Sequence, residues 1–271
     1  MLQFFGRNSA FYREQNSAFF IDGTDLVMMD CAMSAFHKLV AIMNQTDDSG
    51  TVTASDISSS SADRDALPNP ETIKRITILV THTHGDHIGG IPMLIFYAYY
   101  VWHIPVTVAA PSKEVEDDLR YLIERLEGCE PEMFTLTLAE SLKWVRAVIP
   151  TEHTPTLSGR CFGYSLALPD ETAVYTGDTC TLEPFLPYLD ADFAEPVGHT
   201  NASSVSEIRQ VSLYTESAVF RSPVHLCIDD ILPTITALTE KGVRVYLMHL
   251  DNEEAILEKI KETRIRLAPL V

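Results

Sequence analysis

The sequence has few of the features that mark secreted or membrane-spanning proteins. Its first residues lack the long apolar segment of a signal peptide, and no stretch reaches the roughly 18–20 apolar residues of a membrane helix. The longest apolar run, residues 91–106, is interrupted by Pro92, His103 and Pro105. The five cysteines are odd in number and contain no C-x-x-C pair. We therefore expect reduced thiols, a cytoplasmic location and no membrane association.

Positive charge is also scarce. The chain has 20 Lys and Arg against 38 Asp and Glu, which gives a formal net charge of −18. Such a surface repels polyanions, whereas a nucleic-acid binder usually presents a basic face. The charge balance argues against nucleic acid as a partner and favours a small-molecule substrate. It leaves open whether the chain forms a homo-oligomer.

Apolar residues are plentiful enough to build one large core. They make up 46% of the 271 residues, a length that a single domain of two packed layers can reach. The segment from about 44 to 70 differs, because it is rich in Ser, Asp and Thr and nearly devoid of large apolar residues. We predict a mobile surface insertion there, within one domain spanning residues 1–271. Strand-rich halves, each closed by helices, predict a layered α/β sandwich.

Residues 81–90, THTHGDHIGG, concentrate side chains that bind metals. His82 and His84 are two positions apart, so on an extended segment both point the same way. Asp86 and His87 follow where the chain should turn into a helix. A polar loop bonded to backbone and water is the alternative, but four ligand-type residues within six positions favour a metal site.

This segment resembles the H-x-H-x-D-H signature of the metallo-β-lactamase superfamily. The resemblance implies an αββα four-layer sandwich with the metal site at the edge between two sheets. It also implies three later ligands, His153, Asp178 and His249, which follow strand-like segments in the expected order. One metal would bind His82, His84 and His153, the other would bind Asp86, His87 and His249, and Asp178 would bridge the two.

The resemblance further implies a metal-dependent hydrolase in which a hydroxide bridges two divalent ions. Histidine and carboxylate ligands suit zinc, which we expect first, and also iron or manganese. Asp86 and Asp178 are therefore predicted to be catalytic as well as metal-binding. His225 and His199 are rival candidates for the general acid. Asp30, which ends an early strand, is predicted to support the metal loop without binding metal.

The substrate is less well defined by the sequence. The stretch from Phe4 to Cys31 is similar to the start of phosphodiesterase branches, including the tRNA-processing ribonuclease Z. Those branches often carry a His-Glu pair, whereas Ala194 stands before Glu195 here, which argues against ribonuclease Z activity. A small phosphodiester or cyclic phosphate is our first expectation. A lactone, thioester or lactam is the alternative on the same site, and a redox or purely metal-binding member is a weaker third.

Overall fold

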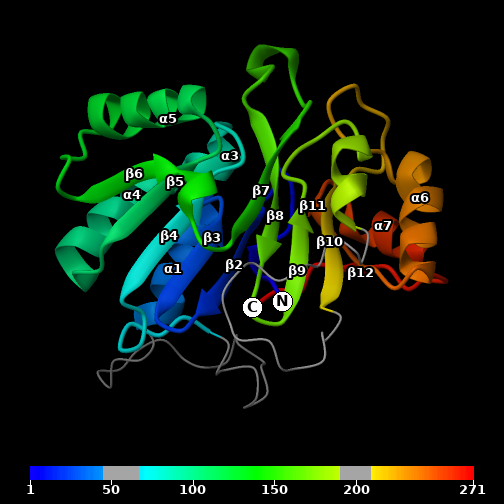
Figure 1. Ribbon diagram of the computed structural model, residues 1–271, viewed down its shortest axis with the longest axis horizontal. Coiled ribbons are helices and arrows are strands. Elements are labelled where there is room, and N and C mark those ends of the chain that lie inside the picture. The colour runs from blue at the N-terminus through cyan, green and yellow to red at the C-terminus, as the bar shows by residue number, and fades with distance from the viewer. Residues whose placement is uncertain (45–66, 190–208) are drawn as a thin grey trace, which may run out of the picture. The chain divides into compact units, whose positions relative to one another are not determined.

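The computed structural model describes residues 1–44, 67–189 and 209–271. The predicted insertion at about 44–70 therefore lies largely outside the described residues, as do Ala194, Glu195 and His199. Two compact units make up the chain, and each contains one sheet with its own helices (Figure 1). Within the described ranges, no helix is long and apolar enough to cross a membrane. The N-terminal unit consists of Leu2–Leu138 and Pro269–Val271, and the C-terminal unit of Ala139–Ala268 and Met1.

The N-terminal unit is built on a six-stranded mixed sheet in the order β1-β2-β3-β4-β5-β6. Strands β1 to β3 pair antiparallel, and β3 to β6 pair parallel. The predicted turn at Asp22-Gly23 joins β2 to β3. β4 is buried on both faces after its first residue, which suits its continuous apolar run. The strands are β1 (Gln3–Gly6), β2 (Ser17–Asp22), β3 (Asp25–Met29), β4 (Arg75–Leu79), β5 (Val106–Ala110) and β6 (Phe134–Leu138).

The helices described in this unit have ends that follow local sequence signals. The Ser112 side chain accepts a hydrogen bond from the Val115 N–H and so caps α5. Pro92 lies in the first turn of α4, where its missing N–H costs nothing. α4 continues as a π-helical turn, Ala98–Trp102. The helices are α1 (Met33–Asn44), α3 (Gly85–Ile88), α4 (Ile91–Tyr97) and α5 (Lys113–Arg120).

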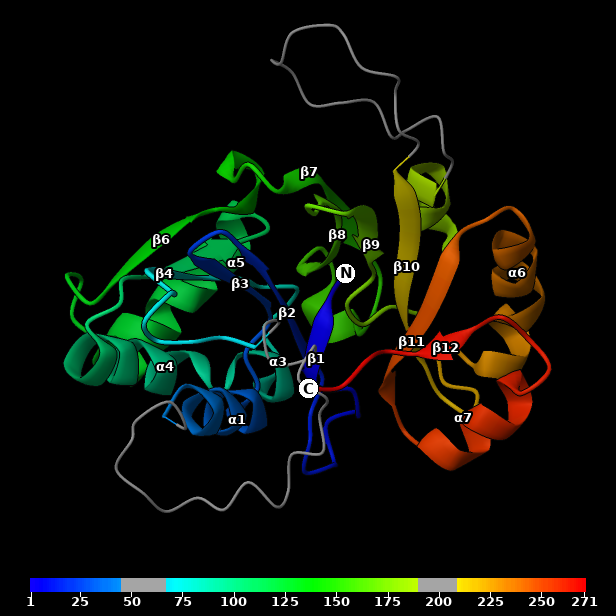
Figure 2. The ribbon, with the colours of Figure 1, turned by 90° about the horizontal axis from the view of Figure 1, so that it is seen from below.

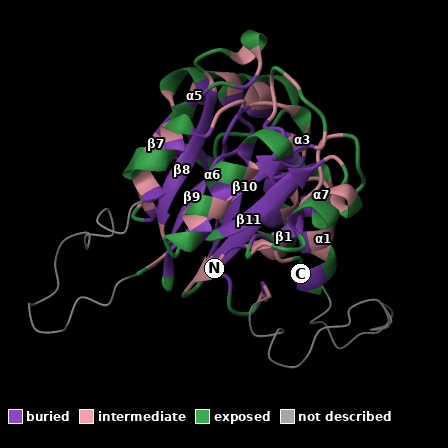
Figure 3. Cartoon of the chain, turned by 90° about the vertical axis from the view of Figure 1, so that its right-hand side faces the viewer, coloured by how far each residue is buried: buried purple, intermediate pink, exposed green. Residues whose placement is uncertain are grey.

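The C-terminal unit contains a second six-stranded mixed sheet, in the order β12-β11-β10-β9-β8-β7. β7 to β9 pair antiparallel and β9 to β12 pair parallel, so this sheet repeats the strand order and directions of the first (Figure 2). Strands β8 to β11 are almost wholly buried (Figure 3). The strands are β7 (Val145–Thr151), β8 (Cys161–Ala167), β9 (Glu171–Tyr175), β10 (Gln210–Ser217), β11 (Arg244–Leu250) and β12 (Arg266–Leu267).

Helices α6 (Ile228–Glu240) and α7 (Glu253–Ile260) lie in the described part of this unit. α6 packs against β11, and α7 begins at Asn252, whose side chain accepts from the Ala255 N–H. The predicted α/β class is confirmed, because each unit pairs a mixed sheet with helices, the composition of the αββα fold. Strand β10 was not predicted from the sequence, and it carries the buried carboxylate of Glu216.

Candidate metal centre

In the N-terminal unit, the predicted ligand loop begins at the carboxyl end of β4. β3 is the parallel neighbour of β4, so Asp30 comes to the same edge of the sheet. Asp30 is fully buried, and its backbone has a φ of 59°, a left-handed conformation that is uncommon outside glycine. The conformation directs the chain from β3 toward the loop and places the Asp30 carboxylate beneath it.

A chain of hydrogen bonds runs from Asp30 to the first histidine. Asp30 Oδ1 accepts from the Thr81 N–H and Oδ2 accepts from the Thr81 hydroxyl, each at 2.8 Å. Because that hydroxyl donates to Asp30, its oxygen accepts from His82 Nδ1, 3.0 Å away. The His82 proton is thereby held on Nδ1, and Nε2 carries the lone pair. His82 Nε2 lies 3.0 Å from His84 Nδ1.

His87 is oriented by the same carboxylate. Its Nδ1 donates to Asp30 Oδ2 at 2.8 Å, and the side chain is fully buried. The opposite ring nitrogen, Nε2, lies 3.4 Å from Asp86 Oδ2. The Asp30 carboxylate thus holds both His82 and His87 in the tautomers in which Nε2 can bind a metal. These are the contacts that the predicted supporting role of Asp30 requires.

The glycine pair after the motif permits a close backbone approach. A Cβ on Gly90 would lie 2.5 Å from the carbonyl oxygen of Ala32 and 2.9 Å from that of Cys31. In the other direction, Cys31 N–H donates to the carbonyl of His87 at 2.7 Å. The backbone of the loop therefore contacts the segment that follows β3, and this contact fixes the backbone that carries the histidines.

In the C-terminal unit, three predicted ligands gather at strand ends. His153 follows β7, Asp178 follows β9, and His249 lies near the end of β11. Asp178 Oδ2 lies 3.3 Å from His249 Nε2 and 3.7 Å from His153 Nε2. The His153 Nδ1–H donates to the Val224 carbonyl at 2.7 Å, which leaves Nε2 as the nitrogen turned toward the carboxylate. All three side chains are nearly buried.

A β-bulge aims His249. Glu216 and Ser217 of β10 pair with Met248 and Leu250 of β11, so His249 is the extra residue between them. Its φ of 50° is again left-handed. In a regular strand, side chains point alternately to the two faces of the sheet. The bulge interrupts this alternation at His249, whose Nε2 lies 3.3 Å from Asp178 Oδ2.

Glu216 was missed by the sequence analysis. It lies at the end of β10, is 1% exposed, and accepts hydrogen bonds from the Thr179 N–H and, at 2.6 Å, from His225 Nδ1. Burial raises the pKa of Glu216 above its ordinary value, the His225 hydrogen bond opposes that rise, and the Asp178 charge adds to it. The sequence does single out Glu216 as a candidate site residue, because it is the only charged residue in the segment QVSLYTES.

The predicted general acid His225 belongs to the same cluster. Its ring centroid lies 4.8 Å from that of His153 and 5.5 Å from that of His249. One ligand atom from each of Asp178, His225 and His249 falls within 4.8 Å of the others. The rival candidate His199 lies outside the described residues, so the structure places only His225.

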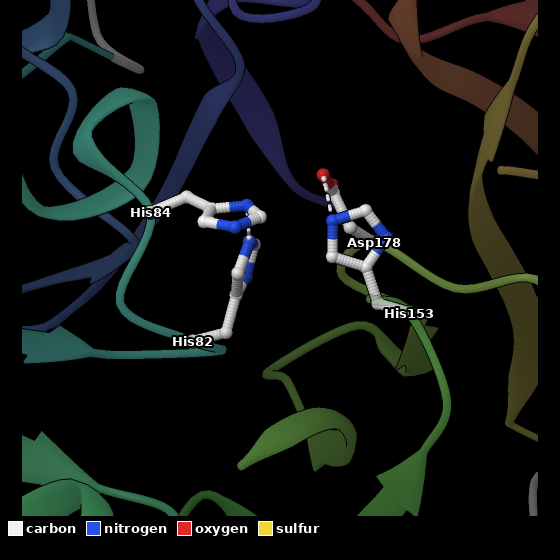
Figure 4. A group of neighbouring side chains, drawn as sticks. All are labelled: His82, His84, His153 and Asp178. Atoms are coloured by element: carbon white, nitrogen blue, oxygen red, sulfur yellow. Dashed lines mark hydrogen bonds and ion pairs between the residues drawn. The ribbon is translucent and has the colours of Figure 1, made fainter. Parts of the chain in front are cut away.

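The donor sets in both units suit divalent metal ions. Four of the side chains are drawn in Figure 4, with dashed lines joining His82 to His84 and His153 to Asp178. Metal–nitrogen bonds of about 2.1 Å in a tetrahedral site place two ligand atoms about 3.4 Å apart. The measured separations within each unit run from 3.0 to 3.7 Å. Imidazole nitrogens with fixed tautomers and carboxylate oxygens at these spacings fit transition metals.

Comparison with known proteins agrees with this chemistry. A family model described as a beta-lactamase superfamily domain matches residues 55–250. No curated protein matches the chain.

Several solved structures share the fold at low sequence identity. The metallo-β-lactamase fold protein YhfI from Bacillus subtilis has a TM-score of 0.64 and 13% identity over 98% of this chain and 94% of that one. A diphosphatase from the PhnP family has a TM-score of 0.59 and 14% identity over 99% and 94%. Human tRNase Z, short form, has a TM-score of 0.56 and 14% identity over 92% of both chains.

The family model spans well over half of the chain, and it covers the ligand loop together with the three later strand-end residues. The structural comparisons confirm the predicted fold along nearly the whole length. The chain therefore belongs to the metallo-β-lactamase superfamily and is a hydrolase of that superfamily.

Proposed function

We propose that the ligands of the two units together hold two divalent ions, zinc first among the candidates. The support is that His82, His87 and His153 each hold Nδ1 in a hydrogen bond while Nε2 lies within 3.0 to 3.7 Å of another candidate ligand atom. Asp178 would serve both ions. The first ion would take His82, His84 and His153, and the second would take Asp86, His87 and His249.

Bound divalent ions supply a nucleophile by lowering the pKa of coordinated water toward about 7, and they stabilise charge on the substrate. The chain's own contribution is proton delivery. Glu216 accepts the Nδ1–H of His225, and a carboxylate partner stabilises the imidazolium form. His225 can then donate its Nε2 proton to the departing oxygen. Glu216 Oε2 also lies 4.0 Å from His249 Nδ1, which is too long for a hydrogen bond, so the carboxylate orients the His225 ring and only adds negative charge beside His249.

The proposed substrate is a small phosphodiester or cyclic phosphate. The observation that carries this choice is the buried Glu216–His225 pair beside the Asp178 cluster. An alkoxide leaving group is a strong base, and it departs readily only when a positioned acid protonates it. The net charge of −18 favours a small molecule over a nucleic acid, and five free cysteines fit a reducing compartment such as the cytoplasm.

Hydrolysis of a lactone, thioester or lactam is the second candidate. The observation that favours it is the presence of two carboxylates, Glu183 and Asp230, around the same cavity as His225. They disfavour an anionic substrate relative to an uncharged carboxyl ester. Both reactions use the same donor set, so only substrates separate them.

Metal analysis and a substrate panel test the proposal. Protein purified without chelator should contain close to two transition-metal ions per chain and should hydrolyse bis-p-nitrophenyl phosphate faster than lactone or thioester substrates. Asp178→Asn should abolish turnover and reduce the metal content, while Asp170→Asn, at an exposed turn, should change neither. Folded protein that binds no metal and gains no activity from added Zn²⁺ or Mn²⁺ would refute the assignment.

A further inference from the structure

A cavity of about 380 Å³ opens beside His225, and all its lining residues belong to the C-terminal unit. The 3₁₀ segment Glu183–Leu189, the loop before α6 and the first half of α6 form its walls. Its size falls within the range of small-molecule sites. The apolar lining comes from Leu182, Leu186, Leu226 and Ile231.

The cavity adjoins the proposed reaction centre through one side chain. His225 lines it, and the His225 side chain is 23% exposed although Nδ1 is held by Glu216. The same imidazole lies within ligand distance of Asp178 and His249. A group in the cavity would therefore lie against the imidazole that we propose as the proton donor.

The charge around the cavity is negative. Glu183 and Asp230 line it, and the lining includes no lysine or arginine. Both oxygens of Asp230 accept from the guanidinium of nearby Arg221, at 2.7 to 3.1 Å, so these two charges offset each other. Glu183 then supplies the negative charge of the lining, and an anionic group entering the cavity would be repelled by it.

We propose that this cavity binds the leaving group of the substrate, and that the leaving group is a compact, uncharged, apolar alcohol or phenol. The inference rests on the proposed function. In the reaction, the oxygen of water bonds to phosphorus while the bond from phosphorus to the leaving oxygen breaks. The Nε2 proton of His225 passes to that oxygen, and the proton that the water loses leaves to solvent, from which His225 is reprotonated. An acyclic diester gives a phosphomonoester and a neutral alcohol. Nucleotides and other leaving groups with further phosphates are excluded.

Two aryl esters of equal size test the charge selectivity. Methyl 3-carbamoylphenyl phosphate has a neutral leaving group, and methyl 3-carboxyphenyl phosphate has an anionic one. We expect the metal-loaded enzyme to favour the neutral ester by about tenfold or more in kcat/KM, mainly through KM. Glu183→Lys should reduce that preference several-fold. Glu240→Lys, an equal charge change at the exposed end of α6, should leave it unchanged.

A second measurement is independent of turnover. Cys180 lines the cavity and is partly exposed, while the other four cysteines are buried. The product phenol 3-hydroxybenzamide should slow alkylation of Cys180 by N-ethylmaleimide, and 3-hydroxybenzoate should not. Equal kcat/KM for the two esters, or selectivity without protection of Cys180, would overturn the leaving-group pocket. Failure to hydrolyse any ester would instead refute the proposed function itself.

Discussion

Replacing Asp30 with Asn tests whether one buried carboxylate organises the ligand loop. Asn keeps the size of the side chain and tolerates the left-handed φ of 59° at this position. What it removes is the charge and one acceptor. The three donors that converge on Asp30 are the Thr81 N–H, the Thr81 hydroxyl and His87 Nδ1.

The expected cost can be worked from these three bonds. An amide oxygen in the place of Oδ2 could still accept from the Thr81 hydroxyl and from His87. The amide NH₂ would then face the Thr81 N–H, so one buried donor would lose its acceptor. Leaving a buried donor unsatisfied costs about 1–3 kcal/mol of folding free energy. Loss of a carboxylate that orients metal-binding histidines typically lowers metal affinity by about 10–100-fold.

Urea unfolding of chelator-treated protein measures the first effect, and competition with a chromophoric zinc chelator measures the second. Asp25→Asn is the matched control, because Asp25 lies at the other end of β3. Its ion pair with the exposed Arg75 is long, at 3.8 Å, and therefore weak. The control should lose no more than about 0.5 kcal/mol and no metal affinity. If Asp30→Asn unfolds more easily yet binds zinc as the wild type does, the carboxylate supports the fold alone and the reasoning fails.

Gly90→Ala should lower the free energy of unfolding in urea by about 1–3 kcal/mol, because the new Cβ would overlap the Ala32 carbonyl. An unchanged free energy of unfolding would mean that the loop is not tightly held. His225→Gln should slow esters of poor leaving groups such as methanol by about 10²–10⁴-fold and nitrophenyl esters far less, and equal losses on both would argue against a general acid. A thiol reagent should modify Cys180 ahead of the four buried cysteines in the native protein, and all five only after denaturation; a disulfide would contradict this.

Much of the fold was predictable because its elements have strong local signals. The turn at Asp22-Gly23, the buried strand β4 and the capped helices α5 and α7 all follow from short sequence patterns. β10 was missed for a physical reason. Its sequence QVSLYTES mixes apolar and polar residues, yet nearly all of it is buried, because some of its polar side chains bond to residues that are distant in the sequence. Ser212 and Tyr214, for example, both donate to Glu171.

The candidate site likewise contains residues that were predicted from the sequence and one that was missed. The loop at residues 82–87 is compact in sequence and could be recognised at once, as could the strand-end positions of His153 and Asp178. Glu216 could not be assigned a role, because its function depends on His225, nine residues later, and on Asp178, in another strand connection. A pattern of residue types does not show which carboxylate will be buried against which imidazole.

The roles of Asp30 and His249 were expected from the sequence, but their left-handed backbone was not. The structure describes three non-glycine residues with positive φ, and these are two of them. A backbone of this kind costs on the order of 1 kcal/mol or more for a residue with a Cβ, and glycine would relieve it. Glycine would also remove the carboxylate that orients His82 and His87, or the imidazole that the β11 bulge turns toward Asp178. At both positions the side chain that lies in the candidate metal centre is therefore held by a backbone conformation that disfavours any residue with a Cβ.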